Sequence, residues 1–459
     1  MKILLVQPPP RRTEHESIVV PPLGLAYLAA TVEGKGYDVK ILDAFALQQS
    51  WTEFEESVKK AGADLIGIGG MTPVIDNTYR ALKICRKYCK HLVLGGPHAT
   101  LSKENILKEA PEVDFVVCGE GEETFAELVD GLSSKGEVSG ILGTVDRNAV
   151  NPPRPLIQDL DRLPFPARHL LPNDRYNYVF AKRKTITTMF TSRGCPYQCI
   201  FCDKSVFGSQ CRLRSAENVL AEIGEILDCS EDVSIVFYDD LFTLKKERVI
   251  RICEGILERG FKFDWKCEGR VDRIDGEMLG WMKKAGCSMI AYGVESGNQS
   301  GLDYLRKNTK LENAKKAFAL THKSGIGTMA YFILGIPVET YEDEIKTIEF
   351  AKELNPDYAQ FSVLSPFPGT ELYETAIKDG SYLETGVKNP ADKDLKKPVV
   401  LSQNWDEKRL NDIMLKAHTS FYFRPRYLIK RLASIRNISD LKRFFMAGLK
   451  MLSWAQCFS

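Results

Sequence analysis

The chain has 459 residues, a formal net charge of +1, 44% hydrophobic and 27% charged residues. These values are typical of a soluble globular protein of two or three domains, and they exclude a global field that would recruit nucleic acid. No secretion signal and no apolar run long enough to span a bilayer is found, so the 12 cysteines indicate thiols of a cytoplasmic protein rather than disulfides.

The first 140 residues are expected to form one domain in which strands and helices alternate. Short apolar stretches predict strands over Lys2–Gln7, Asp38–Asp43, Asp64–Gly69, His91–Leu94 and Phe115–Val117. Amphipathic stretches predict helices over Leu23–Glu33, Trp51–Lys60, Val74–Tyr88, Ser102–Lys108 and Glu122–Gly131. This α/β alternation predicts a doubly wound parallel sheet, whose ligands bind at the carboxyl ends of the strands.

Glycines gather at three of these strand ends, in the sequences 67–72, 95–100 and 119–124. Glycine lets the backbone approach a flat or bulky ligand, and the absence of G-x-G-x-x-G after the first strand disfavours a dinucleotide. With the sequence 21–25, these loops resemble the cobalamin-binding domain found ahead of many radical S-adenosylmethionine (SAM) cores. The resemblance implies cobalamin contacts at Gly69, Gly70, Thr72, Gly95, Gly96, His98, Gly119 and Gly121.

The Asp-x-His-x-x-Gly signature of histidine-ligated cobalamin domains is absent. His98 lies in a Gly-Gly-Pro-His loop and does not establish an axial ligand. We therefore expect a lower cobalt face with a weak or water ligand. A degenerate domain that binds nothing is the alternative.

Residues 141–184 are rich in proline and predict a linker that runs as an extended strap over the surface. Six strands are then expected over Thr185–Thr191, Ser234–Tyr238, Phe263–Glu268, Ser288–Val294, Gly327–Leu334 and Tyr358–Leu364. Helices are expected over Ser215–Leu227, Lys245–Arg259 and Gly276–Ala285. The pattern predicts a (βα)6 partial TIM barrel over residues 185–375 with its site at the carboxyl ends of the strands, followed by a helical C-terminal region over 376–459.

Three cysteines, Cys195, Cys199 and Cys202, follow the first of these strands with Cys-x3-Cys-x2-Cys spacing. Three thiolates on one small loop can hold three irons of a 4Fe-4S cluster and leave the fourth iron open to a small molecule. A zinc site with Cys211 as fourth ligand is the alternative, although paired C-x2-C motifs are its usual signature.

The cysteine spacing resembles that of the radical SAM enzymes. The resemblance implies that the open iron binds SAM, and that one electron, from a reduced ferredoxin or flavodoxin, cleaves SAM to a 5′-deoxyadenosyl radical. It implies further SAM contacts near the strand ends, at Phe201, Asp239, Asp240, Arg270, Glu295 and Gly335. Arginine suits a carboxylate because its guanidinium is planar and bidentate. For each charged residue the alternative is a salt bridge at the barrel rim.

Four further strings, 237–243, 269–272, 292–297 and 367–370, are similar to those of cobalamin-binding radical SAM enzymes related to the anaerobic magnesium-protoporphyrin ester cyclase. Hopanoid- and tetraether-lipid-modifying enzymes and class B methyltransferases belong to this group, and the resemblance covers about residues 1–430. It implies methyl transfer to an unactivated carbon. A radical cyclase or oxidase and a non-enzymatic cobalamin or cluster sensor are the alternatives. The sequence assigns no catalytic acid or base. Tyr292, Tyr331 and Tyr358, on barrel strands, could relay a proton or electron, and packing in the core is the alternative for each.

The sequence from Phe421 to Ser459 is rich in lysine and arginine, interleaved with aromatic residues and leucine. A basic amphipathic helix predicts contact with the inner membrane face, which would favour a lipid or other hydrophobic substrate. A helical cap packed on the barrel is the alternative. No RNA-binding module accompanies the domains, so nucleic acid is not an expected partner.

Overall fold

A computed structural model describes residues 1–10, 18–134, 138–178, 180–384, 387 and 397–433. The chain forms two compact units, each discontinuous in sequence. The first contains Met1–Pro196, Lys204–Cys267 and Lys284–Cys287, and the second contains Tyr197–Asp203, Glu268–Lys283 and Ser288–Ser459. The expected domain boundaries at residues 140, 184 and 375 stay predictions.

A six-stranded sheet of the first unit has the strand order β3-β1-β4-β5-β6-β7. Its strands are β1 (Lys2–Gln7), β3 (Asp38–Asp43), β4 (Leu65–Gly69), β5 (His91–Gly95), β6 (Phe115–Val117) and β7 (Thr144–Val145). All neighbours are parallel except β7, an unpredicted strand that pairs antiparallel with β6. The predicted doubly wound parallel sheet is confirmed.

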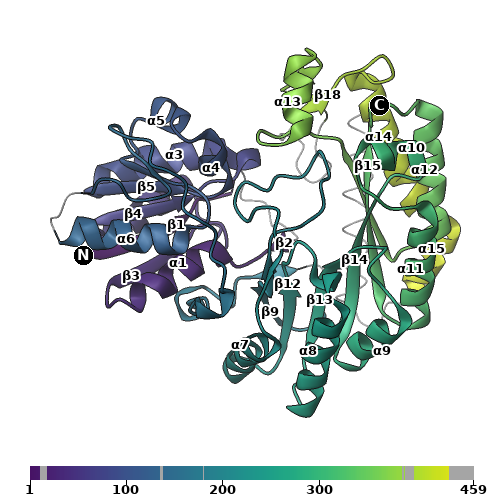
Figure 1. Ribbon diagram of the computed structural model, residues 1–459, viewed down its shortest axis with the longest axis horizontal. Coiled ribbons are helices and arrows are strands. Elements are labelled where there is room, and N and C mark those ends of the chain that lie inside the picture. Colours follow the sequence, from purple (N-terminus) through teal and green to yellow (C-terminus); the bar gives the residue numbers. More distant parts are fainter. Residues whose placement is uncertain (11–17, 135–137, 179, 385–386, 388–396, 434–459) are drawn as a thin grey trace. The chain divides into compact units, whose positions relative to one another are not determined.

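Helices cover both faces of this sheet (Figure 1). One face carries α1 (Leu23–Glu33) and α6 (Gly121–Ser133), and the other carries α2 (Trp51–Ala61), α3 (Ile75–Cys85), α4 (Pro97–Ser102) and α5 (Asn105–Glu109). Successive strand residues enter opposite cores because side chains alternate along a strand, so Leu4 faces the α2–α5 side while Leu5 faces α1 and α6.

The helix predicted over residues 102–108 is found only in part, as α5, and the preceding α4 was not predicted. Helix α4 begins at Pro97, whose fixed φ suits the first helical position, and it ends before Lys103. Lys103 has φ 44°, which ends the right-handed helix, and α5 starts two residues later. The predicted helix over 74–88 is shorter, since only α3 is α-helical and 3₁₀ turns flank it.

The proline-rich stretch contains the expected irregular backbone, but it is not only a surface strap. Strand β8 (Asn177–Tyr178) pairs antiparallel with β2 (Ile18–Val19). Leu171 and Tyr176 are buried in a core with Val19, Ala26 and Ile186. These apolar side chains anchor the strap within the first unit.

A second six-stranded sheet has the order β16-β15-β14-β13-β12-β9. Its strands are β9 (Thr185–Met189), β12 (Val233–Phe237), β13 (Asp264–Gly269), β14 (Cys287–Glu295), β15 (Gly327–Leu334) and β16 (Tyr358–Val363). Its helices include α7 (Ala216–Cys229), α8 (Lys246–Glu258), α9 (Gly276–Lys284), α11 (Leu311–Lys323) and α12 (Tyr341–Leu354). The parallel pairings within each unit confirm the predicted six-stranded partial barrel, although α11 and α12 had not been predicted individually.

The second unit ends in α13 (Glu371–Lys378), the short β17–β18 hairpin (Tyr382–Leu383 and Val399–Val400), α14 (Glu407–Tyr422) and α15 (Pro425–Ala433). The Tyr422 hydroxyl donates to Ala359 O at 2.6 Å, and that of Tyr427 donates to Asp357 O at 3.2 Å. The start of the basic tail therefore packs against β16 as a cap, while residues 434–459, on which the membrane expectation also rests, lie outside the described residues. In the part of the chain that the structure describes, no helix combines the length and apolarity needed to cross a membrane.

Candidate functional site

The cysteine loop starts from a short antiparallel pair of strands, β10 (Ser192–Arg193) and β11 (Arg212–Leu213). Gly194 follows β10 with φ 86°, and a Cβ there would lie 2.3 Å from the carbonyl oxygen of Gln210. Only glycine combines this left-handed backbone with this close approach. The chain turns at Gly194, and Cys195 is the next residue.

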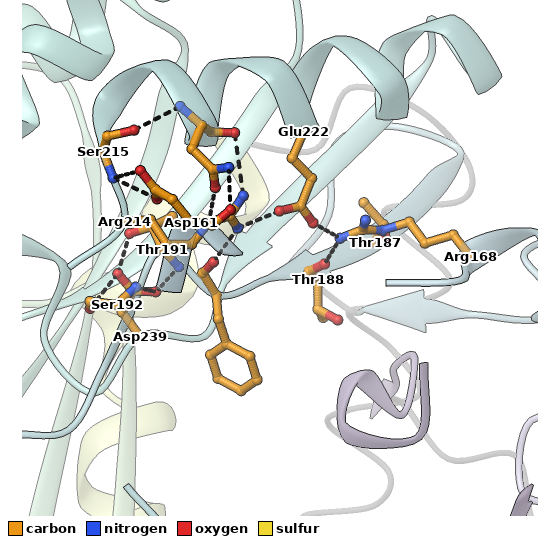
Figure 2. Close-up of polar contacts among 12 residues, drawn as sticks. Asp161, Arg168, Thr187, Thr188, Thr191, Ser192, Arg214, Ser215, Glu222 and Asp239 are labelled. Atoms are coloured by element: carbon orange, nitrogen blue, oxygen red, sulfur yellow. Dashed lines mark hydrogen bonds and ion pairs between the residues drawn. The ribbon is translucent and has the colours of Figure 1, made fainter. Parts of the chain in front are cut away.

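Asp239, at the end of β12, holds the start of this loop (Figure 2). Its carboxylate accepts hydrogen bonds from the backbone N–H of Thr191 (2.6 Å) and of Ser192 (3.1 Å), and from both hydroxyls. Burial raises the pKa of Asp239, whereas Arg248 and these donors lower it. Asp240 accepts from Gly194 N at 3.0 Å. Both acids position the loop, and their contact with SAM stays a prediction.

A second buried acid, Glu222 of α7, fixes the strand that leads into the loop (Figure 2). It is fully buried and pairs with Arg168 of the proline-rich strap at 2.5 Å and with Arg214. Arg168 also donates to Thr188 O, and Arg214 donates to Phe190 O. The sequence showed no sign of this clamp, because an isolated glutamate on a helix usually faces solvent.

Cys195 belongs to the first unit, and Cys199 and Cys202 belong to the second. Cys202 is exposed and the other two are partly buried. Within the described ranges, no three or more His, Cys, Asp or Glu side chains are arranged to hold a metal ion. The donor chemistry fits an iron–sulfur cluster, because thiolates are its usual ligands and these three side chains are at least partly accessible. Phe201 packs against an apolar cluster that contains Leu305.

Two predicted SAM residues of the second unit already have partners. The Arg270 guanidinium lies 3.7 Å from the centre of the Tyr197 ring, and its Nε donates to Asp272 at 2.8 Å. Glu295 accepts from Lys307 Nζ at 2.5 Å. Their SAM contacts stay predictions, and Lys307 is a charged neighbour that the sequence did not single out.

Glu268 of β13 is a further residue that the sequence did not indicate. It accepts a hydrogen bond from the Tyr331 hydroxyl at 3.1 Å. Burial raises its pKa to about 7, while the bond from Tyr331 acts in the opposite direction. A carboxyl that titrates near neutrality can hold or release a proton under working conditions.

Glu268→Gln should change how stability depends on pH. A glutamate in the unfolded chain titrates near ~4.3, so the stability that protonated Glu268 contributes is present below that pH and lost as pH rises through about 7. The glutamine variant cannot ionise. As pH rises from about 5 to about 8.5, the free energy of unfolding of the variant should therefore increase by roughly 2 kcal/mol relative to that of the wild type. Denaturant unfolding across this range, with exposed Glu258→Gln as control, measures the difference. A difference that does not vary with pH would contradict the assignment.

Two buried carboxyls that the sequence did not indicate, Glu344 and Glu339, lie at or next to the turn after Gly335, one of the predicted SAM contacts. Glu344 accepts from the backbone N–H of Gly335 at 2.6 Å and of Ile336 at 3.3 Å. Glu339 accepts from the Ser296 hydroxyl at 2.6 Å. Burial raises the pKa of Glu339 to about 7 and that of Glu344 as well, and the neighbouring carboxyl raises Glu344 further. The raised pKa values favour the protonated forms of these carboxyls, and Glu344 supports the turn through its two backbone hydrogen bonds.

The glycine-rich loops of the first unit meet at the carboxyl ends of β4, β5 and β6. Gly70 N donates to Gly95 O at 2.9 Å, and Gly119 N donates to the Thr100 hydroxyl at 2.9 Å. Gly96 has φ 95°, and a Cβ there would lie 2.9 Å from Gly70 O. This close-packed, glycine-rich backbone at the strand ends fits a large flat ligand.

His98 belongs to the second of these loops and has 9% of its surface exposed. Its Nδ1 lies 3.1 Å from the Thr72 hydroxyl, and its Nε2 lies 3.3 Å from the hydroxyls of Tyr79 and Ser102. Burial lowers its pKa. Both ring nitrogens are used within the protein, which supports the expectation that His98 is not an axial cobalt ligand.

Gly96→Ala should weaken hydroxocobalamin binding at least about tenfold. Gly96 has ψ −175° with its positive φ, a backbone conformation that costs other residues of order 1–3 kcal/mol, and its new methyl group would push against Gly70. Equilibrium dialysis with hydroxocobalamin measures the loss. Gly280→Ala, in α9 with no atom within 4 Å of the added carbon, is the control. Unchanged affinity in Gly96→Ala would place the ligand away from this loop.

Two protein families match successive parts of the chain. The B12 binding domain family matches residues 18–129, and the Radical SAM superfamily matches residues 189–351. An uncharacterized methyltransferase of Pyrococcus horikoshii is 38% identical over 440 residues, which cover 94% of each chain. The chain belongs to the cobalamin-binding radical SAM methyltransferase family.

This cobalamin-binding radical SAM protein is an enzyme, and its cofactors are cobalamin, SAM and a 4Fe-4S cluster. The anaerobic magnesium-protoporphyrin IX monomethyl ester cyclase of Rubrivivax gelatinosus is 32% identical, over 77% of this chain and 66% of that protein. The zinc site with Cys211, the degenerate first domain and the sensor are therefore not retained.

Two solved structures share the fold of this cobalamin-binding radical SAM enzyme. The methyltransferase TsrM from Kitasatospora setae, with cobalamin and a [4Fe-4S] cluster bound, has a TM-score of 0.74 at 17% identity, over 93% of this chain and 90% of TsrM. OxsB, with aqua-cobalamin and SAM bound, has a TM-score of 0.77 at 18% identity, over 99% of this chain and 71% of OxsB.

Proposed function

We propose that the enzyme transfers a methyl group to an unactivated carbon of a lipid or other hydrophobic small molecule. The observation that carries this proposal is the similarity over 94% of both chains to the Pyrococcus protein, whose name is that of a methyltransferase. A hopanoid C-3 methylase of Methylococcus capsulatus, 26% identical, supports a lipid-like substrate. A cytidylyl-2-hydroxyethylphosphonate methyltransferase of Streptomyces wedmorensis, 28% identical, shows that polar substrates occur among the relatives.

In this proposal the three cysteines of the loop ligate the cluster, and the glycine-rich loops contact cobalamin. The proposed SAM contacts are Phe201, Asp239, Asp240, Arg270, Glu295 and the turn at Gly335. Asp239 and Asp240 also set the direction in which the cysteine loop leaves β10. When bound, the cofactors supply a carbon-centred radical and a methyl group. A reduced ferredoxin or flavodoxin supplies the electron in the cytoplasm, and the basic tail brings the enzyme to the inner membrane face.

A radical cyclase or oxidase without methyl transfer is the second candidate. The 32% identity to the Rubrivivax protein favours it, because that protein is named as a cyclase of magnesium-protoporphyrin IX monomethyl ester. The two candidates differ in one product, since only methyl transfer converts SAM to S-adenosylhomocysteine.

The test uses anaerobically reconstituted full-length enzyme with SAM, hydroxocobalamin, a reductant and a total lipid extract. Mass spectrometry quantifies 5′-deoxyadenosine and S-adenosylhomocysteine in the same sample, with Cys199→Ala as the blank. A rise of both products with extract supports methyl transfer to a lipid. A rise of 5′-deoxyadenosine alone supports the cyclase or oxidase, and a rise only with a polar extract would overturn the lipid substrate.

A further inference from the structure

Arg193, the residue before the turn at Gly194, extends from the cysteine loop into the glycine-rich domain. Its side chain is 3% exposed. Its Nη1 donates to Glu120 Oε1 at 2.7 Å, and its Nη2 donates to Glu122 Oε1 at 2.5 Å. Both glutamates belong to the sequence Gly119-Glu120-Gly121-Glu122, the third of the glycine-rich loops. One side chain therefore connects the backbone beside Cys195 with a loop assigned to cobalamin.

Arg212 binds Glu120 as well. It lies opposite Arg193 in the β10–β11 pair. Arg212 Nη1 donates to Glu120 Oε2 at 2.7 Å, and the same oxygen accepts from Ile157 N at 2.8 Å. The Arg193 guanidinium also lies 5.1 Å from the centre of the Tyr27 ring. Two arginines and two glutamates thus form a charge-balanced cluster with fixed geometry.

Stability alone does not account for this cluster. Taking four charges out of water costs several kcal/mol per ion, and apolar side chains of similar volume are often at least as stabilising in such positions. An arginine held by two carboxylates instead fixes the orientation of its side chain relative to both carboxylates, because its N–H donors form a rigid fork. A shift of the backbone at Gly119 or Gly121 must move Glu120 and hence Arg193, and the reverse also holds.

We propose that Arg193 is a positioning residue that couples the cobalamin loop to the cluster loop, so that filling the cobalamin site alters the binding of SAM. The proposal rests on the cofactor contacts assigned under the proposed function. Coupling of this kind is reciprocal, because SAM must change the affinity for cobalamin by the same factor. The pairs Arg193–Glu120 and Arg193–Glu122 carry it.

The test measures binding rather than turnover, so it needs no substrate. Equilibrium dialysis with radiolabelled SAM on the cluster-loaded full chain gives the SAM Kd with and without saturating hydroxocobalamin, and the reverse titration checks reciprocity. In the wild type the two SAM Kd values should differ at least about fivefold. In Arg193→Met the ratio should fall to about 1 with iron content retained, while Arg193→Lys, which keeps the charge without the fork, should give an intermediate ratio.

Arg193→Met leaves Glu122 buried without its partner, so the double variant Arg193→Met with Glu122→Leu is the second probe. The double variant should fold with a full cluster, and its ratio of SAM Kd values with and without hydroxocobalamin should also be about 1. Arg251→Met removes an exposed ion pair with Glu217 and should keep the wild-type ratio. Equal SAM Kd values in the wild type, or an unchanged ratio in the double variant, would overturn the coupling. Failure of methyl transfer would appear only in the product assay and leaves this binding measurement intact.

Discussion

Cys199→Ala should abolish the reductive cleavage of SAM. Two thiolates cannot hold the cluster that the Cys-x3-Cys-x2-Cys loop is built to bind, and no other side chain of that loop is a comparable ligand. After anaerobic reconstitution, iron content should fall and 5′-deoxyadenosine should drop to the level of iron-free protein. Cys195→Ala and Cys202→Ala should give the same result.

Cys229→Ala and Cys211→Ala are the matched controls. Cys229 is exposed at the end of α7, and burial raises the pKa of the Cys211 thiol to about 11, which keeps it protonated. Both variants should retain the cluster and the product. A Cys211→Ala protein without iron would add Cys211 to the ligand set, and a Cys199→Ala protein with full iron content would remove Cys199 from it.

Glu222→Gln should destabilise the first unit by about 3–5 kcal/mol, because it leaves Arg168 and Arg214 buried without their shared counter-charge. The loss should appear as a lower unfolding midpoint in denaturant, followed by tryptophan fluorescence and by circular dichroism. The two signals are needed because a chain of two units need not unfold in one step.

The matched control is Glu225→Gln, three residues further along the same helix, where the side chain is exposed. That variant should stay within about 0.5 kcal/mol of the wild type, as is usual for surface positions. If Glu222→Gln were equally mild, the clamp of Figure 2 would be dispensable for folding.

Local patterns were enough to predict both sheets. Alternating apolar strands and amphipathic helices indicated the doubly wound sheet and the partial barrel, which the strand orders confirm. The ligand surface expected at the glycine-rich strand ends of the first sheet stays a prediction. The break between α4 and α5 was missed, because Lys103 adopts a positive φ that no sequence pattern signals.

The partners of the site residues could not be predicted, because they come from distant parts of the chain. Arg193 meets Glu120 across 73 positions, and Asp239 meets Thr191 across 48. Position in the chain showed that Asp239 ends a strand next to the cysteine loop. It did not show that four donors from that loop converge on its carboxylate, since this depends on how β9 and β12 are paired.

Because the first unit is discontinuous in sequence, a fragment that ends near residue 140 does not contain a complete folding unit. Val19, Ala26 and Ala46 of the glycine-rich part share one core with Leu171, Tyr176 and Ile186, which the strap and β9 supply. A fragment that ends near residue 140 would lose half of that core and expose the other half to water, together with unpaired Glu120 and Glu122. Recombination between relatives would meet the same obstacle. The glycine-rich part thus depends on the strap and on the first barrel strand for its packing, and a cut near residue 140 should not yield a stable separate domain.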